Sequence, residues 1–376
     1  MQIGIFETVH FEGAYPVIKL FDNGHNEITI FTYETSYQQF EHLFKDGMHK
    51  YNWIVKQESE SKYEFIVRLY KISKKSKLDI LYINTISDNH ILYAITIALL
   101  RKAKIIVTLH DINSHFDFEP GLSIRKWIRY IGKRSLIKAV NDFNVVSSTM
   151  VTYLKNKLPS YKKVHCVPGS IFEQSKRPAS LNNISGSIHI VIPGTIDQRR
   201  RNYELVFDLL DEINQKKIDI SIVLLGGINE YGKDILDKCK QYISKTGVLK
   251  FFQTDIVDQP VFDNEMDEAH FILIPSVIDT VISDGIRETY GLSISSGTIF
   301  DVIKHAKPFI IPEQLAIPDN LESSCFKYSA QKDIIPFLES FLANPEKYSK
   351  WKRSALQNSQ EYTIENIRKG NAGLFL

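Results

Sequence analysis

The sequence predicts an α/β protein with two domains of similar architecture. Its 376 residues suffice for two domains of ordinary size. In both halves of the chain, short runs of apolar and β-branched residues alternate with longer segments of helical periodicity. Strands that are apolar throughout are typical of parallel sheets covered by helices on both faces. We therefore expect two Rossmann-like domains that face each other across a cleft.

The expected strands follow the chain in two sets. Those of the first set are residues 2–6, 27–31, 80–83, 105–109, 143–147 and 163–167, with helices such as 91–101 and 149–157 between them. Those of the second set are residues 188–192, 220–225, 249–252, 271–274 and 308–311. The polar stretch EQSKRPASLNNISGS separates the two sets and predicts a linker. The expected organisation is an N-terminal domain (1–172), the linker (173–187), a C-terminal domain (188–360) and a final segment (361–376) that returns to the first domain.

Composition excludes several classes of protein. Hydrophobic residues make up 43% and charged residues 24%, which excludes a disordered or fibrous chain. The three cysteines lie far apart without a C-x-x-C pair, which argues against a disulfide framework and a cysteine-based zinc site. No apolar run reaches the ~18 residues of a membrane-spanning helix, and the start MQIGIFETVH lacks the pattern of a signal peptide. We expect a cytoplasmic protein.

Charge is distributed unevenly along the chain. Residues 1–186 carry 25 Lys and Arg against 17 Asp and Glu, whereas the remainder carries 21 against 27. The two halves are therefore expected to respond differently to anionic surfaces and ligands.

The segment VIPGTIDQRRRNYELVFDLL, residues 191–210, combines the end of a strand, a turn at Gly194 and Thr195, and an amphipathic helix. Three consecutive arginines precede that helix: Arg199, Arg200 and Arg201. Guanidinium groups match phosphate oxygens in geometry, and helix N-termini attract anions. The pattern is compatible with a diphosphate site and also with a solvated basic loop.

A second segment, YGLSISSGTIFDVIKHAKPFIIP, covers residues 290–312. Ser296, Gly297 and Thr298 stand where a helix begins and exposes free backbone N–H groups. Asp301 follows one turn later, where a carboxylate can accept hydrogen bonds from a ribose diol; a plain N-cap with a solvent-facing Asp is the alternative. Together the two segments favour a nucleotide diphosphate, which needs contacts to both phosphate and sugar.

In their order and spacing these segments resemble the donor domain of GT-B-fold glycosyltransferases, particularly the mostly retaining family 4 type of bacteria. The matching elements are VIPGTIDQRRRN, SIVLLGG, VLKFFQTDI, HFILIPS and SGTIFDVIKHAKP. The interval from Asp301 to Pro308 equals that from the ribose-binding Glu to the Pro of the family. The resemblance rests on motifs over most of 187–312 and on organisation alone over 1–170.

The resemblance implies roles for individual residues. Arg201 would hold the donor diphosphate and stabilise the leaving group, with Arg199 as a second contact, and Asp301 would bind the ribose in place of the usual Glu. The other residues implied at the diphosphate are Gly194, Thr195, Ser296, Gly297 and Thr298. Those implied at the base are Gln253, Thr254 and Ile256. The chemistry is expected to need no metal and no cofactor besides the nucleotide-sugar co-substrate.

The chain departs from the family at one acidic position. Family members usually carry an acid near the transferred sugar, separated by seven residues from the ribose Glu. Counting back from Asp301 gives Ser293; Glu288 is nearby but out of register, and extra residues separate Ser276 from Tyr290. The sugar and the retaining stereochemistry are therefore left open.

The first domain contributes candidates at the ends of its strands. The motif VTLHDIN, residues 107–113, places His110 where relatives of the family have a histidine that touches the donor sugar; an ordinary loop histidine is the alternative. His10, Glu12 and Gly13 follow the first strand and are candidates for the acceptor side.

Residues 122–139, LSIRKWIRYIGKRSLIKA, predict a basic amphipathic helix that contains a tryptophan. No acid lies between Glu119 and Asp142. Such a helix can bind an anionic membrane, with each basic group contributing on the order of 1 kcal/mol, or it can pack on its own domain. Nucleic-acid binding is not expected, because no interleaved aromatic platform accompanies the charge.

We therefore predict a glycosyltransferase that moves a sugar from a nucleotide-diphosphate donor to a glycan or lipid-linked acceptor, in bacterial surface-polysaccharide assembly. The protein would be cytoplasmic and peripheral at the inner membrane face. A non-catalytic GT-B subunit and a nucleotide-sugar epimerase of the same fold are the alternatives. A dehydrogenase is disfavoured, because no G-x-G-x-x-G follows the first strand of either domain.

Overall fold

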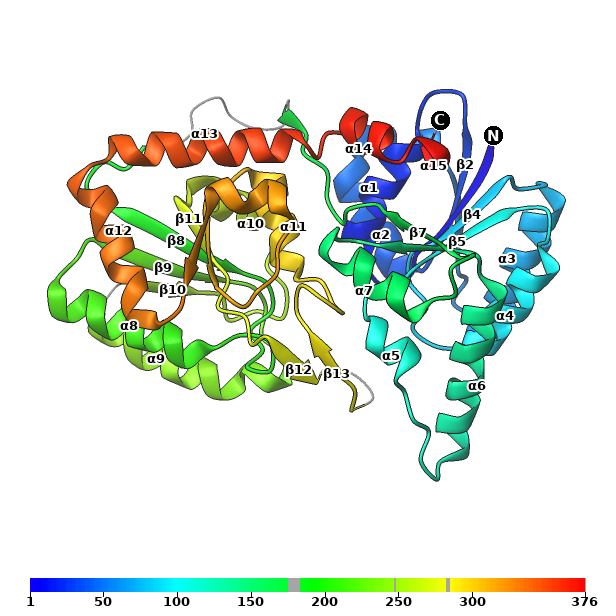
Figure 1. The fold of residues 1–376 in the computed structure, drawn as a ribbon, viewed down its shortest axis with the longest axis horizontal. Coiled ribbons are helices and arrows are strands. Elements are labelled where there is room, and N and C mark those ends of the chain that lie inside the picture. Colours follow the sequence, from blue (N-terminus) through cyan, green and yellow to red (C-terminus); the bar gives the residue numbers. More distant parts are fainter. Residues whose placement is uncertain (175–182, 247, 282–284, 376) are drawn as a thin grey trace.

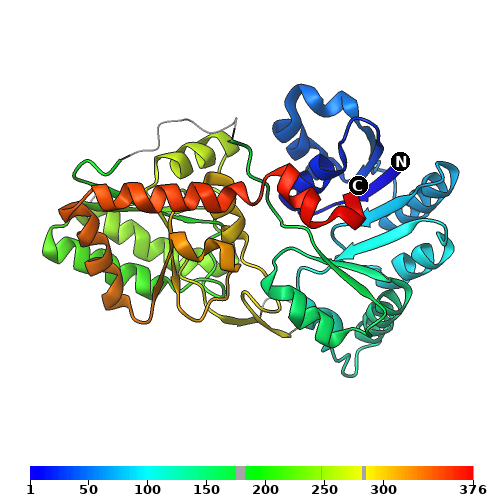
Figure 2. The same cartoon turned by 45° about the horizontal axis from the view of Figure 1, so that its top comes forward.

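The computed structural model describes residues 1–174, 183–246, 248–281 and 285–375. Each half of the chain forms one parallel sheet between layers of helices (Figures 1 and 2). The prediction of two Rossmann-like α/β domains is therefore confirmed. Most of the predicted linker, residues 175–182, lies outside the described residues.

The N-terminal sheet has seven strands in the order β3-β2-β1-β4-β5-β6-β7. They are β1 (Gln2–Phe6), β2 (Glu27–Thr32), β3 (Asn52–Val55), β4 (Ile80–Ile83), β5 (Lys104–Thr108), β6 (Asp142–Val145) and β7 (Lys163–Cys166). One face packs against α1 (Phe11–Phe21) and α2 (Glu34–Phe44). The other packs against α3 (Lys62–Lys75), α4 (His90–Leu99), α6 (Ile124–Ala139) and α7 (Thr149–Lys157). A short helix, α5 (Ile112–Phe116), follows β5.

The C-terminal sheet has six strands in the order β10-β9-β8-β11-β14-β15. They are β8 (Ile188–Pro193), β9 (Ile220–Leu225), β10 (Leu249–Phe251), β11 (Phe271–Leu273), β14 (Phe309–Pro312) and β15 (Cys325–Tyr328). Helices α8 (Tyr203–Lys216), α9 (Lys233–Thr246) and α12 (Ile334–Ala343) cover one face. Helices α10 (Gln259–Glu268) and α11 (Gly297–His305) cover the other.

Three features of the fold are absent from the sequence prediction. The strands β3 and β15 lie at sheet edges and are only partly buried, so they lack the buried apolar run that marks the inner strands. The third is an antiparallel hairpin of β12 (Asp279–Val281) and β13 (Arg287–Thr289). It accounts for the extra residues noted between Ser276 and Tyr290.

The end of the chain crosses back to the N-terminal domain. Helix α13 (Glu346–Gln360) spans the C-terminal domain, and α14 (Ile364–Gly370) and α15 (Ala372–Phe375) lie beside α1 (Figure 1). Arg368 donates to the backbone carbonyls of Leu20 and Asp22, each at 2.8 Å. These bonds satisfy carbonyl groups at the end of α1 that have no partner within the helix.

Candidate active site between the two domains

The domains touch beside the carboxyl ends of their sheets, where ligands of open α/β sheets bind. The backbone N–H of Ile112 in α5 donates to the carbonyl of Ser293 at 2.8 Å, and Asp111 forms an isolated β-bridge with Ile294. The loop after β5 is thus held against the segment that leads into α11.

Arg201 lies directly over the glycine turn that follows β8. Its Nη1 donates to the carbonyl of Thr195 at 2.7 Å and its Nη2 to the carbonyl of Pro193 at 2.6 Å. Gly194 has a φ of +98°, and a Cβ at this position would lie 2.3 Å from Arg201 Nη2. Only glycine therefore allows both the turn and the close approach of the guanidinium.

The same guanidinium reaches the first turn of α11. Arg201 Nη2 lies 3.4 Å from Oγ1 of Thr298. Ser296, the residue before the helix, makes no side-chain capping bond, and a Cβ on Gly297 would meet no atom within 4 Å. The structure thus brings Arg201 and an open helix N-terminus together, an arrangement that attracts anions.

Arg199 has a different partner. Its Nε and Nη2 donate to the two carboxylate oxygens of Asp197 at 3.0 and 2.6 Å, and its guanidinium carbon lies 3.3 Å from the centre of the Tyr231 ring. Burial opposes the ionisation of Asp197, yet the hydrogen bonds from Arg199 and Asn229 outweigh it and lower the pKa to about 2. Arg199 therefore stabilises the loop through its pair with Asp197. The sequence analysis missed Asp197.

Asp301 lies within electrostatic reach of both domains. The pKa of its carboxyl is raised to about 7: burial is the main cause, Glu12 of the N-terminal domain adds to the shift, and Lys304 and Arg201 oppose it. The pKa of Glu12 is also raised overall, mainly because the group is desolvated, and Lys304 opposes this shift. The start of α1 and helix α11 therefore lie close enough for the charges of Glu12, Asp301 and Lys304 to interact.

The loop that follows β8 and carries the three arginines, residues 194–202, is called the arginine loop below. A hollow of about 480 Å³ lies next to it, at the carboxyl ends of β9 and β10. Gln253 and Thr254 line it, as two of the residues predicted at the base; Ile256 is 75% exposed and is not among the lining residues. The remaining lining residues are Ile228, Asn229, Glu230, Lys233, Leu236 and Asp255. Asn229 connects the hollow to the loop, because its Nδ2 donates to Asp197 at 3.1 Å.

On the N-terminal side, two histidines approach each other. The ring centres of His10 and His110 are 5.2 Å apart, and His110 Nε2 lies 2.8 Å from the carbonyl of Asn84. Burial lowers the pKa of His10, and His110 lowers it further. Gly13 lies beside the pair, since a Cβ there would be 3.5 Å from Asn84 Nδ2.

Glu7 organises this side of the site and was missed by the sequence analysis. Its fully buried carboxylate accepts hydrogen bonds from the backbone N–H groups of Val9 and His10, from Asn84 Nδ2 at 2.6 Å and from Thr85 Oγ1 at 2.8 Å. Thr85 Oγ1 lies 3.4 Å from His110 Nε2. An acid directly after a buried strand is the signal that could have identified this residue from the sequence.

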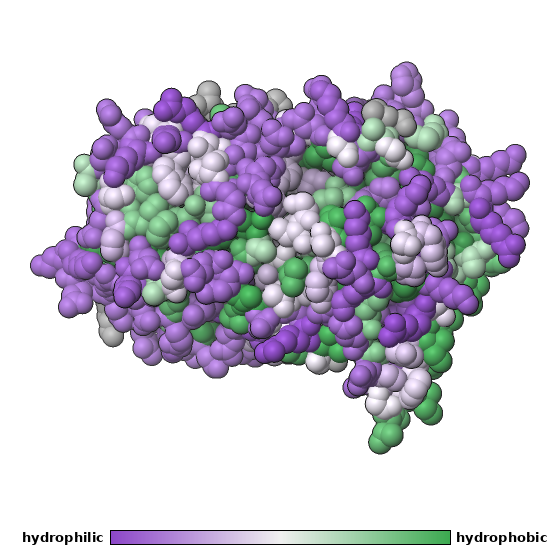
Figure 3. Space-filling model, in the orientation of Figure 1, coloured by the Kyte–Doolittle hydropathy of each residue, from purple (hydrophilic) through white to green (hydrophobic). Residues whose placement is uncertain are grey.

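Helix α6 presents the predicted amphipathic face to solvent. Leu122, Ile124, Trp127, Ile128 and Ile131 are between 48% and 104% exposed. The helix projects from the domain in Figure 1, and the end of this projection is green in Figure 3, which marks hydrophobic residues. In the described part of the chain, no helix is both long and apolar enough to cross a membrane.

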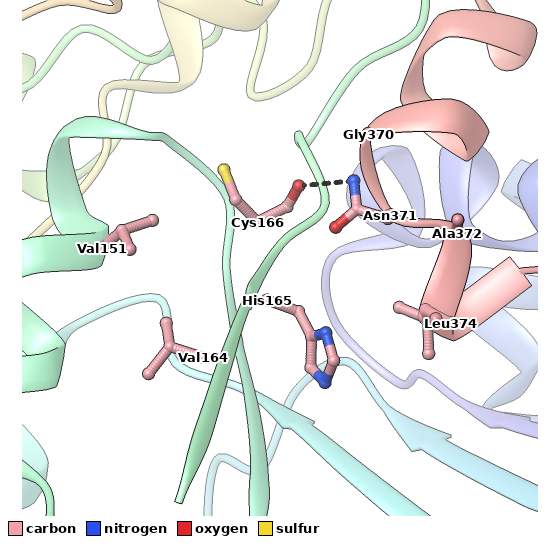
Figure 4. Close-up of a pocket in the computed structure, with 9 residues that line it drawn as sticks. Val151, Val164, His165, Cys166, Gly370, Asn371, Ala372 and Leu374 are labelled. Atoms are coloured by element: carbon pink, nitrogen blue, oxygen red, sulfur yellow. Dashed lines mark hydrogen bonds between the residues drawn. The ribbon is translucent and has the colours of Figure 1, made fainter. Parts of the chain in front are cut away.

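A second hollow, of about 380 Å³, lies between β7, α7 and the returning C-terminal segment (Figure 4). His165, Cys166 and Asn371 are among its lining residues, and the Asn371 side chain donates to the carbonyl of Cys166 at 3.2 Å. None of the predicted site residues lines it.

Comparison with solved structures defines the fold. HepE from Anabaena, solved with UDP and glucose, matches with a TM-score of 0.69 at 12% identity, over 100% of this chain and 99% of that chain. The UDP-GlcNAc 2-epimerase of Neisseria meningitidis bound to UDP-GlcNAc matches with a TM-score of 0.57 at 14% identity, over 99% of both chains. The lipopolysaccharide outer core galactosyltransferase WaaB matches with a TM-score of 0.58 at 12% identity, over 99% of this chain and 98% of that chain. The chain has the GT-B fold.

The family comparison adds to the fold. Residues 19–174 match the model of Glycosyltransferase Family 4. The resemblance to family 4 glycosyltransferases is thus confirmed, and the match lies in the N-terminal domain, where the sequence offered organisation alone. No curated protein matches the chain.

Proposed function

We propose that this protein is a glycosyltransferase that takes a sugar from a nucleotide-diphosphate donor. The observation that carries the proposal is the position of Arg201 between the glycine turn and the start of α11, with Thr298 Oγ1 3.4 Å from its Nη2. A diphosphate there meets a guanidinium and free helix amides, which stabilise the charge that develops on the leaving group. This supports chemistry without a metal.

The rest of the donor fits around that point. The base occupies the hollow lined by Gln253 and Thr254, and the ribose hydroxyls donate to Asp301. The transferred hexose then points toward His110 of the N-terminal domain, and the acceptor enters beside His10, Glu12 and Gly13. Alignment of donor and acceptor between two domains supplies much of the rate enhancement. UDP is the favoured nucleotide, because two of the structural relatives named above, HepE and the 2-epimerase, are solved with UDP or a UDP-sugar.

We infer that the acceptor is a glycan or a lipid-linked glycan at an anionic membrane, as in bacterial surface-polysaccharide assembly. The support is α6, whose exposed apolar residues are accompanied by the exposed bases Arg125 and Lys126. Lys133, by contrast, is buried and donates to the carbonyl and hydroxyl of Ser114 at 2.8 Å each. Membrane contact therefore involves the first two turns of α6.

A vesicle-binding experiment tests this contact. Reversing Arg125 and Lys126 to Glu is expected to weaken binding to vesicles with 30% anionic lipid at least tenfold, since each basic group contributes about 1 kcal/mol. Reversal of the exposed Lys347 and Lys350 in α13 is the matched control and is expected to change nothing. Equal binding by both variants would refute the membrane role of α6.

The reaction itself is tested by proton NMR of UDP-glucose, UDP-galactose and UDP-GlcNAc incubated with the protein and, in parallel, with Arg201→Ala. Slow release of UDP and free sugar, lost in the variant, supports a transferase that uses water in place of its acceptor. Interconversion of UDP-GlcNAc with its 2-epimer would instead support the epimerase alternative. Unchanged donors with and without bacterial membranes as acceptor source would favour a non-catalytic subunit.

A further inference from the structure

The hairpin of β12 and β13 bridges the two domains next to the proposed donor site. Its base is attached to the arginine loop: Val277 N–H donates to the carbonyl of Arg200 at 3.0 Å, and Thr280 Oγ1 to the carbonyl of Arg199 at 2.9 Å. Its second strand reaches α5 of the other domain, where Asn113 Nδ2 donates to the carbonyl of Arg287 at 3.0 Å.

The central contact of this bridge is a buried carboxylate. Glu288 is 2% exposed and accepts the backbone N–H groups of Ser114 at 2.8 Å and of Asn113 at 3.3 Å, both in α5. A hydrogen bond from the Ser293 hydroxyl also reaches it. The family pattern has a carboxyl at the position of Ser293. In this protein a carboxyl lies beside Ser293 instead, and it belongs to Glu288 in the second strand of the hairpin.

The hydrogen bonds to Glu288 compensate for the burial of its carboxyl group. The pKa of Glu288 is raised to about 7: burial is the main cause, and the hydrogen bonds from Ser293 and Ser114 oppose the shift. A buried carboxyl without these donors would destabilise the interface, because its desolvation would not be compensated. On the far side, Ser114 is held by the buried amine of Lys133 in α6.

The direction of Glu288 decides what it can do. Both of its oxygens accept backbone amides of α5, so we do not assign it the contact with the transferred sugar that the family acid makes. However, α5 begins just after His110 and Asp111, and the segment that leads into the hairpin is hydrogen-bonded to the arginine loop through Val277 and Arg200. The hairpin that carries Glu288 therefore links the loop of Arg201, through Val277 and Thr280, to the helix that follows His110, through Glu288.

We propose that Glu288 is a positioning residue that holds His110 in register with the donor loop, replacing by an interdomain contact the acid that is missing at Ser293. The inference rests on the proposed function, because it assigns a role in that reaction. It also explains why the hairpin occurs in the donor domain at the point where the family motif is interrupted.

The test compares Glu288→Ala and Glu288→Gln with the wild type. The alanine variant is expected to lower kcat for UDP-sugar turnover at least tenfold and to leave the affinity for UDP within twofold. The glutamine variant keeps one oxygen for Ser114 and is expected to recover part of the loss. Asp279→Asn, on the exposed side of the same hairpin, is the matched control and is expected to retain full turnover.

Hydrogen exchange of residues 111–118 provides a readout that does not require activity. Faster exchange in this segment for Glu288→Ala, with unchanged exchange in the C-terminal sheet, is expected; it is also interpretable if turnover is too slow to measure. Wild-type exchange rates, or wild-type kcat in an active protein, would overturn the positioning role. Failure of the wild-type protein to bind UDP would instead overturn the proposed function.

Discussion

At the scale of residues, two arginines of one loop, Arg199 and Arg201, make different contacts because their surroundings differ. Arg199 is held bidentate by a buried carboxylate and stacks on Tyr231, whereas Arg201 lies against backbone carbonyls at the entrance to α11. The sequence RRR does not distinguish them, since their difference depends on Asp197 and on a helix about a hundred residues later. The sequence nevertheless places both arginines in one loop between a strand and a helix, as the structure has them.

The pKa of Asp301 leads to a pH-dependent prediction for donor binding. Because burial raises this pKa to about 7, the carboxyl is partly protonated at neutral pH, and only the ionised form accepts both ribose hydroxyls. UDP affinity is therefore expected to rise from pH 6 to pH 8 by up to about tenfold per unit below the pKa. Titration calorimetry of the wild type and Asp301→Asn checks it, and an identical pH slope in both proteins would contradict it.

At the scale of elements, the loop after β8 depends on its buried ion pair. Asp197 is fully buried and hydrogen-bonded to Arg199 and Asn229. Removal of one partner of a buried pair leaves the other charge uncompensated, which typically costs about 3–5 kcal/mol. An exposed pair contributes much less.

Because Arg199 is 28% exposed, water partly compensates its charge once Asp197 is removed, and Asp197→Ala is expected to lower the free energy of unfolding by about 2 kcal/mol. Glu204→Gln, which removes an exposed partner of Lys238, is the matched control and is expected to change it by less than about 1 kcal/mol. Urea denaturation measures both. Equal stability of the two variants would show that the arginine loop does not depend on this pair.

The elements also show where sequence reasoning succeeds and where it stops. Inner strands such as β8 and β9 carry continuous apolar runs, so their positions follow from the pattern. The edge strands β3 and β15 are partly exposed, and the hairpin of β12 and β13 is stabilised by the other domain. Glu288 was visible as an acid out of register, but its contact with α5 depends on tertiary structure alone.

At the scale of the whole molecule, the C-terminal segment fastens the two domains together. Phe375 is 2% exposed and its ring centre lies 4.8 Å from that of Phe21 in α1, while Arg368 bonds to the end of the same helix. The core of the N-terminal domain thus includes residues from the last part of the chain.

Phe375→Ala is expected to destabilise the N-terminal domain by about 3 kcal/mol, because truncation of a buried aromatic ring leaves a cavity. Leu99→Ala, at a leucine that is 56% exposed, serves as the control and is expected to have little effect. Calorimetric unfolding tests the pair. A midpoint for Phe375→Ala equal to that of the wild type would mean that the segment does not contribute to this core.

The central claim, a donor diphosphate site at Arg201, is tested most directly by thermal unfolding with UDP. We expect UDP at a hundred times its Kd to stabilise the wild type by about 2.7 kcal/mol. This stabilisation should be greatly reduced in Arg201→Ala and retained in Lys240→Ala, a surface control. An equal upward shift in Arg201→Ala, or no shift of the wild type with UDP, would contradict the account.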